Sequence, residues 1–357
     1  MLYTDLMLPR ERVQRALARR KTDRVPLDFW ATPEVWMALK SYFGVKNEEE
    51  LLRILQIDMR EFRPDYIGPP CEKLADGSYY EPLGTHRRTI SNKYNTYEEY
   101  AGFPLAYAKT AEDLESYRWF SADHYDFQGL SAKIGEAHKT YCIKLWLGGF
   151  FELAWALRGY EQFLMDMVLI PEIPHFILGK IVDFYLEYLD RAMASAAEKI
   201  DLVYAYDDIA SQRGMLMSTQ MWEDFVKPCH VRINAKIHHY GKKVLYHSCG
   251  NIYKKEILDG LLDMGVDILN PIQMCGDMTL EQLKDEYGDK FCFHGGIDIQ
   301  KVLPFYSGKD LRAEVKRVAQ TLGREGGFIL TSTHCIQNDT PVSNIIAMFE
   351  EAAGLKL

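Results

Sequence analysis

The sequence predicts a single α/β domain of the (β/α)8 barrel class, and three observations support this prediction. Short apolar runs alternate with helical stretches along the chain, which is typical of parallel sheets built from βα units. Eight such runs occur, and eight units close most naturally into a barrel. No glycine-rich phosphate fingerprint follows any run, which removes the main reason to prefer an open doubly wound sheet.

The eight predicted strands are short and apolar, and a helical stretch follows each. They cover residues 25–30, a segment within 59–67, and then residues 142–147, 202–206, 244–246, 266–269, 291–293 and 328–330.

The helices between the strands have recognisable starts and apolar faces. The longest, over residues 173–199, has one continuous apolar stripe. Thr279 and Gln282 form a capping-box signature that opens another helix. Thr340 is the expected N-cap of the last helix, with Pro341 at its first helical position.

Two segments lie outside the βα alternation within this single 1–357 domain. Residues 1–24 are predicted to form an N-terminal helical segment. Residues 70–125, after the second strand, are rich in Gly, Tyr, Asn and Thr and contain short alternating pieces. They predict a hairpin-bearing insertion, and long insertions of this kind are commonly lids or binding loops.

Composition excludes several classes of partner. The 357 residues carry a formal net charge of −9 with mixed signs, which disfavours nucleic acid and acidic membrane surfaces. No apolar stretch approaches about 18 residues and no signal peptide is evident, so we expect a cytoplasmic protein. The seven cysteines lack CxxC spacing and are expected to be reduced.

The run 243–250 ends in two soft-metal ligands, His247 and Cys249, which are two residues apart. In an extended chain such residues point to the same side, so imidazole and thiol would converge. A third candidate ligand, Cys335, follows the run 328–333. Three N/S ligands with an open fourth position are the arrangement of a catalytic zinc ion.

Other polar residues also follow the strands, where a barrel collects its function. Asp207 and Asp208 follow the fourth strand, and at most one of them is expected to face the barrel mouth, because adjacent residues alternate. Their alternative role is helix capping. The same alternation argues against His334 as a ligand beside Cys335, and Cys275 lies on a loop where we do not expect one.

The segments 247–251, 265–271 and 295–298 resemble the uroporphyrinogen decarboxylase superfamily, and the resemblance covers nearly the whole chain. That superfamily contains cofactor-free decarboxylases and zinc-dependent corrinoid methyltransferases. The methyltransferase mark is His-x-Cys with a distant Cys, which His247, Cys249 and Cys335 match. The decarboxylase mark, Arg-Gln-Ala-Gly-Arg after the first strand, is absent from residues 29–34.

The resemblance therefore implies a zinc-dependent methyltransferase. Zinc would either hold a substrate thiolate that accepts a methyl group, or act as a Lewis acid on a methyl ether or similar donor. The aromatic content slightly favours demethylation of a donor. No Asp-x-His-x-x-Gly corrinoid-binding motif occurs, so a corrinoid would arrive on a separate protein. The alternatives are a uroporphyrinogen decarboxylase and a non-catalytic ligand-binding barrel.

Further residues are candidates for the substrate contacts of such an enzyme. Arg158 and Asp208 are candidates for contact with the substrate, and either Asp207 or Asp208 for a catalytic role. Asn270 and Gln273 follow the sixth strand, from which they would orient substrate or a zinc ligand.

Overall fold

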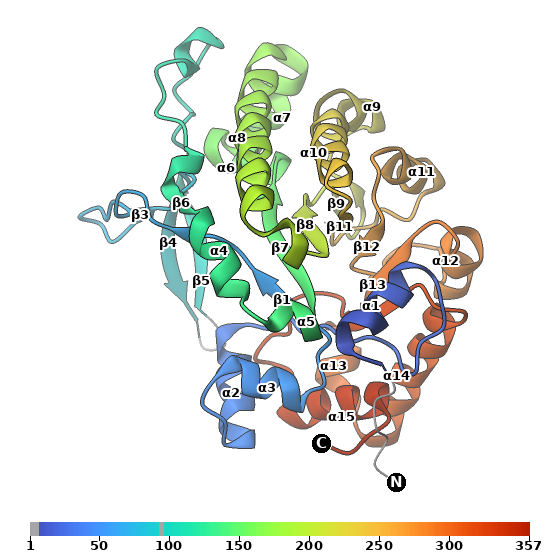
Figure 1. Cartoon of the computed structure of the whole chain (residues 1–357). Coiled ribbons are helices and arrows are strands. Elements are labelled where there is room, and N and C mark those ends of the chain that lie inside the picture. Colours follow the sequence, from blue (N-terminus) through green and yellow to red (C-terminus); the bar gives the residue numbers. More distant parts are fainter. Residues whose placement is uncertain (1–6, 93–95) are drawn as a thin grey trace.

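The computed structural model describes residues 7–92 and 96–357. Within these ranges, seven parallel strands form one curled sheet, which helices surround (Figure 1). In spatial order the strands are β1 (Met59–Phe62), β7 (Cys142–Gly149), β8 (Leu202–Tyr206), β11 (Lys243–His247), β12 (Ile268–Asn270), β13 (Cys292–Ile297) and β14 (Phe328–Ser332).

The prediction of a strand at residues 25–30 is corrected, because this segment makes one isolated bridge, from Leu27 to Leu330, and no continuous ladder. It lies between the two edges of the sheet: Leu330 N–H donates to the Pro26 carbonyl at 2.8 Å, and Asp58 N–H donates to the Leu27 carbonyl at 2.9 Å. Pro26 has no N–H to donate, and Leu27 N–H donates to the Asp58 carboxylate instead of to a strand. A continuous ladder therefore does not form here.

Helices cover the outside of the sheet (Figure 1). Their bounds are α1 (Pro9–Leu17), α2 (Pro33–Phe43), α3 (Glu48–Ile54), α4 (Phe127–Ile134), α5 (Ala137–Thr140), α6 (Phe151–Arg158), α7 (Tyr160–Leu169), α8 (Glu172–Ala196), α9 (Thr219–Met221), α10 (Lys227–His239), α11 (Lys255–Asp263), α12 (Leu280–Tyr287), α13 (Val302–Phe305), α14 (Gly308–Gly323) and α15 (Val342–Ala353). Short 3-10 turns are η1 (Glu112–Leu114), η2 (Ala122–His124) and η3 (Ala197–Lys199), and η4 (Trp222–Val226) is a π-helical turn.

Two predicted helix starts can be compared with the structure. The capping box of α12 is confirmed, with the Thr279 hydroxyl and the Gln282 side chain bonded reciprocally to backbone N–H groups. α15 begins one residue later than predicted: Pro341, not Thr340, is the N-cap, and Val342 is the first helical residue. Pro341 has a ψ of 135°, which is extended and not helical, so the proline stands just before the helix and not in its first turn.

Residues 70–125 contain antiparallel structure beside the main sheet. The strands β3 (Tyr79–Tyr80), β4 (His86–Ser91) and β5 (Thr96–Gly102) form a three-stranded sheet. Two further short antiparallel pairs lie outside this segment or at its end: β2 (Asp65–Tyr66) with β6 (Tyr125–Asp126), and β9 (Ala210–Ser211) with β10 (Gly214–Met215). Part of each predicted segment, residues 1–6 and 93–95, lies outside the described residues. A lid role for 70–125 stays a prediction.

The inside of the curled sheet is built in layers. Alternate strand residues form a lower apolar layer, which comprises Met59, Cys142, Leu202, Leu245, Ile268, Cys292 and Ile329. Two residues further along several of these strands, the inward positions become polar or aromatic, and they are Lys144, Tyr204, His247, Asn270 and His294. The register pairs His247 with Asn270, so this second layer is level across neighbouring strands.

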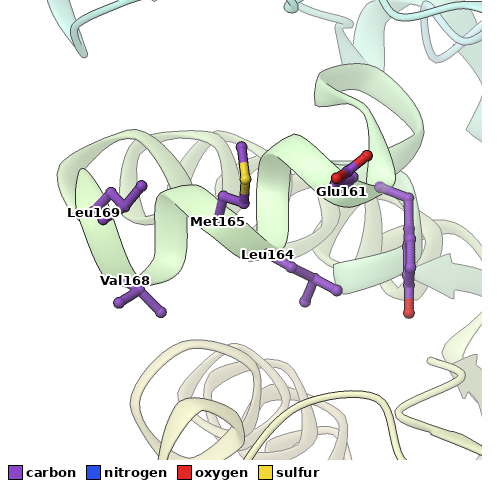
Figure 2. A pocket seen from close by; sticks show the side chains of 6 residues that line it. Glu161, Leu164, Met165, Val168 and Leu169 are labelled. Atoms are coloured by element: carbon purple, nitrogen blue, oxygen red, sulfur yellow. The ribbon is translucent and has the colours of Figure 1, made fainter.

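The outer surface has one notable apolar face. On α7, Val168 is 68% exposed and Leu169 is 72% exposed, and with Leu164 and Met165 they line a shallow pocket (Figure 2). None of the helices in the described ranges is long and apolar enough to cross a membrane.

Candidate metal centre

Three side chains of the kinds that ligate metals meet at the carboxyl end of the sheet. One ligand atom each from His247, Cys249 and His334 lie within 4.8 Å of one another. His247 is the last residue of β11, Cys249 follows it, and His334 follows β14. An N/N/S donor set of this kind suits zinc and similar borderline-soft ions.

A chain of buried hydrogen bonds fixes the orientation of the His247 ring. Its Nδ1 lies 2.5 Å from the Asn270 side-chain oxygen, which can only accept, so the proton is on Nδ1 and the lone pair is on Nε2. The Asn270 amide nitrogen lies 2.5 Å from His294 Nδ1. His294 Nε2 donates to the Asp28 carboxylate at 3.0 Å, and Lys144 Nζ reaches the same oxygen at 2.9 Å. Asn270 therefore makes the hydrogen bond to His247 that its predicted role, orienting a zinc ligand, requires.

The electrostatics of this chain are consistent with neutral imidazoles. Burial lowers the pKa of both His247 and His294. Burial alone would raise the pKa of Asp28, but the ammonium of Lys144 and the hydrogen bond from His294 hold that pKa below its ordinary value. Asp28 and Lys144 thus form a buried ion pair that His294 and Asn270 connect to His247, and His247 presents an unprotonated Nε2.

Of the two predicted aspartates, Asp208 faces the cluster. Its Oδ1 accepts from the Cys249 N–H at 2.9 Å, and its Oδ2 lies 3.0 Å from Cys249 Sγ. Burial, together with the Asp208 charge, raises the pKa of the Cys249 thiol in the absence of a metal. His247 Nε2 is 3.8 Å from Asp208 Oδ1.

Asp207 points the other way and is fully buried. Its carboxylate accepts the N–H groups of Phe150, Phe151 and Glu152 at 2.9–3.1 Å, at the start of α6. His230 Nε2 lies 2.6 Å from the same carboxylate. Asp207 therefore caps α6 across strands, which is the alternative role stated for this pair, and its contacts leave it outside the cluster.

His334 lies in the cluster, which corrects the expectation from strand alternation that it is not a ligand candidate. β14 ends at Ser332, so alternation does not extend to residue 334. The His334 ring lies 5.7 Å from the ring of His247 and 4.8 Å from that of Trp30. Cys335, by contrast, is not part of the cluster within the described chain, and burial raises the pKa of its thiol. Its ligand role stays a prediction.

Two other predicted contact residues have structural partners. The Arg158 guanidinium is buried, donates to Asp166 at 2.7 Å and to the Leu105 carbonyl at 2.6 Å, and so holds the α6–α7 junction. A contact of Arg158 with substrate stays a prediction. Gln273 is also buried, and its backbone N–H donates to the Tyr253 hydroxyl at 2.8 Å.

A cavity of about 550 Å³ lies beside the second layer, between β4–β5 and the ends of β7 and β8. Eight aromatic side chains line it: Tyr66, Tyr100, Tyr125, Trp146, Phe184, Tyr185, Tyr188 and Tyr206. Trp146 and Tyr206 connect it to the cluster, because both contact Tyr204, whose ring lies 6.1 Å from that of His247.

Sequence reasoning missed the roles of Glu152 in the cavity lining and of His294, Asp28 and Lys144 in the buried chain. Strand alternation could have found two of them: His294 is two residues after inward-facing Cys292, and Lys144 is two residues after Cys142. Asp28 and Glu152 give no comparable signal, because neither lies in a regular strand.

Comparisons with known proteins agree with this architecture. A curated uroporphyrinogen decarboxylase from Psychromonas ingrahamii is 21% identical over 179 residues, which are 49% of this chain and 46% of that protein, so the match spans about half of the relative's length. The structure of a methyltransferase from Methanosarcina mazei superposes with a TM-score of 0.69 at 17% identity, covering 98% of this chain and 99% of the other. A likeness at that identity establishes the fold. The family model for uroporphyrinogen decarboxylase (URO-D) matches residues 138–355, more than half of the sequence, and the chain belongs to this family.

Proposed function

We propose that this protein is a zinc-dependent methyltransferase that moves a methyl group between a small substrate and a corrinoid carried by a separate protein. The observation that carries the proposal is the convergence of His247, Cys249 and His334 within 4.8 Å at the carboxyl end of the sheet. The fold shared with the Methanosarcina mazei methyltransferase supports the same reaction class.

The donor set fits a zinc ion with one position left for a reactant. We assign His247 and Cys249 as two ligands. The third comes from the segment after β14, where the geometry favours His334 and the family resemblance favours Cys335. When bound, zinc would supply a Lewis-acidic position for a substrate thiolate or for the leaving atom of a methylated donor.

The protein's own residues prepare this site. Asn270 holds His247 with its Nε2 free of a proton, and Asp208 Oδ2, 3.0 Å from Cys249 Sγ, is placed to accept the thiol proton. The rings of Trp30 and Tyr204 flank the His247 imidazole and limit the access of water. The cavity beside Trp146 offers a chamber for the rest of the substrate.

Zinc titration of the purified protein tests the proposal. Wild type should bind about one zinc per chain, and His247→Ala or Cys249→Ala should abolish tight binding. Comparison of His334→Ala with Cys335→Ala identifies the third ligand. Cys275→Ala is the matched control, since Cys275 is half-buried outside the cluster.

The reaction itself is tested by methyl transfer from methylated donors, or to thiols, with corrinoid proteins. Loss of transfer in Cys249→Ala but not in Cys275→Ala is expected. A wild-type protein that transfers methyl groups fully without zinc, or that binds no zinc at all, would contradict the proposal.

The name of the curated relative makes porphyrinogen decarboxylation the second candidate. A substrate with many carboxylates needs cations, but the cavity lining has two arginines against three acidic residues, Asp65, Glu81 and Glu152. Arg87 is already paired with Glu81 at 2.9 Å. We therefore expect no decarboxylation of uroporphyrinogen in a direct assay, and clear turnover there would favour this second function.

A further inference from the structure

We propose that the aromatic cavity binds the alkylated ammonium group of a small organic cation, with Glu152 as the counter-charge. This inference rests on the proposed function only for the role of the cation as substrate; binding itself does not depend on methyl transfer. The cavity, of about 550 Å³, has the size of a small-molecule site.

The first argument is the composition of the walls. Six tyrosines, a tryptophan and a phenylalanine line the cavity, and the faces of such rings attract cations through their quadrupoles. One existing contact in this cavity illustrates the preference: the Arg87 guanidinium lies 3.7 Å from the centre of the Tyr100 ring. Arg87 is itself paired with Glu81, and several of the other rings pack edge-on against one another, as Tyr125 does with Tyr66 and Tyr188, so the lining is a continuous aromatic wall.

The second argument is the unpaired carboxylate of Glu152. It lines the cavity from the first turn of α6, and among the described residues its side chain has no hydrogen bond or ion pair. The other acids of the lining do have partners, since Asp65 pairs with Lys133 at 2.5 Å and Glu81 with Arg87. A neutral ligand would leave the Glu152 carboxyl desolvated without compensation, whereas an ammonium group would pair with it.

The third argument is the local field. Burial, together with the charges of Asp208 and Asp207, raises the pKa of Glu152 to about 7, which shows that these carboxylates act on the Glu152 side of the cavity and would favour a cation there. The two arginines do not cancel this field: Arg87 is neutralised by Glu81, and Arg63 is exposed. A cation that enters is therefore stabilised by both the rings and the carboxylates.

Calorimetric titration of the intact 357-residue chain, as purified, with choline and with its neutral carbon isostere, 3,3-dimethyl-1-butanol, tests the inference. Both probes have the same shape, so the difference reports the charge alone. We expect choline to bind at least tenfold more tightly. A third titration, with anisole, represents a neutral aryl ether.

Two matched variants locate the contact. Glu152→Gln should weaken choline binding at least tenfold. Glu161→Gln should leave it unchanged, because Glu161 is the second residue of α7 as Glu152 is of α6, but lies exposed outside this cavity. The wild-type comparison of the two isosteres needs no variant, so it decides the question even if Glu152→Gln does not fold.

The inference is overturned if the isostere or anisole binds as tightly as choline, if choline does not bind, or if Glu161→Gln loses as much affinity as Glu152→Gln. Choline binding without any methyl transfer would support this inference and count against the proposed function. Zinc-dependent methyl transfer from a neutral ether, with no choline binding, would do the reverse.

Discussion

Replacing Asn270 with alanine is the sharpest test of how this centre is built. The substitution removes the side chain that joins His247 to His294 through two contacts of 2.5 Å. His247 would then be free to rotate or to exchange its tautomer. Loss of a partner of this kind typically costs about 10–100-fold in metal affinity, or about 1.4–2.7 kcal/mol. Two buried imidazole nitrogens would also lose their partners, at about 1–3 kcal/mol each in folding stability.

The matched control is Asn344→Ala. Asn344 is also buried, and its amide donates to the carbonyls of Leu303 and Tyr306 at 2.8 and 2.7 Å, within contacts made by α13 and α15. We expect both variants to lower Tm, but only Asn270→Ala to weaken zinc binding in competition with a chromogenic chelator. Wild-type zinc affinity in Asn270→Ala, or an equal loss in Asn344→Ala, would refute the reasoning.

Three further predictions concern stability. Because the pKa of Glu152 is raised from 4.5 to about 7, the unfolding free energy of wild type should fall by about 2–3 kcal/mol between pH 4.5 and pH 8 relative to that of Glu152→Gln. Urea unfolding at both pH values measures this, and an equal change in the two proteins would contradict it. Arg158→Met should cost about 3–5 kcal/mol by leaving the buried Asp166 charge without its cation, with only the Gln162 amide as a partner, and Arg158→Met/Asp166→Leu should recover most of it in thermal unfolding, whereas no recovery would argue against the pair. Asp207→Ala should lower the unfolding free energy by about 3 kcal/mol or more, because several donors lose their acceptor, and Asp208→Ala, with a side chain that is 39% exposed, by less than about 1 kcal/mol; equal losses would refute the capping role.

The sequence by itself determined the parallel α/β class and most element positions. Short continuous apolar runs and the amphipathic stripe of α8 are local signals that depend little on the rest of the chain. The His247-x-Cys249 pair was equally readable, because two residues at the end of one strand share a side whatever surrounds them. The absence of a regular strand at residues 25–30 could not be determined in this way. There the N–H of Leu27 donates to the carboxylate of Asp58, 31 residues away, and not to a neighbouring strand.

Only the tertiary structure decided which distant side chains complete the centre. His334 joins the cluster because the chain leaves strand geometry at Ser332, and Asp28 and Lys144 meet although they are 116 residues apart. The same holds for the separation of roles between Asp207 and Asp208, since their partners lie on α6 and beside β11. Alternation along a strand fixes a side chain's direction, but the curvature of the sheet and the loops after each strand fix what that side chain meets.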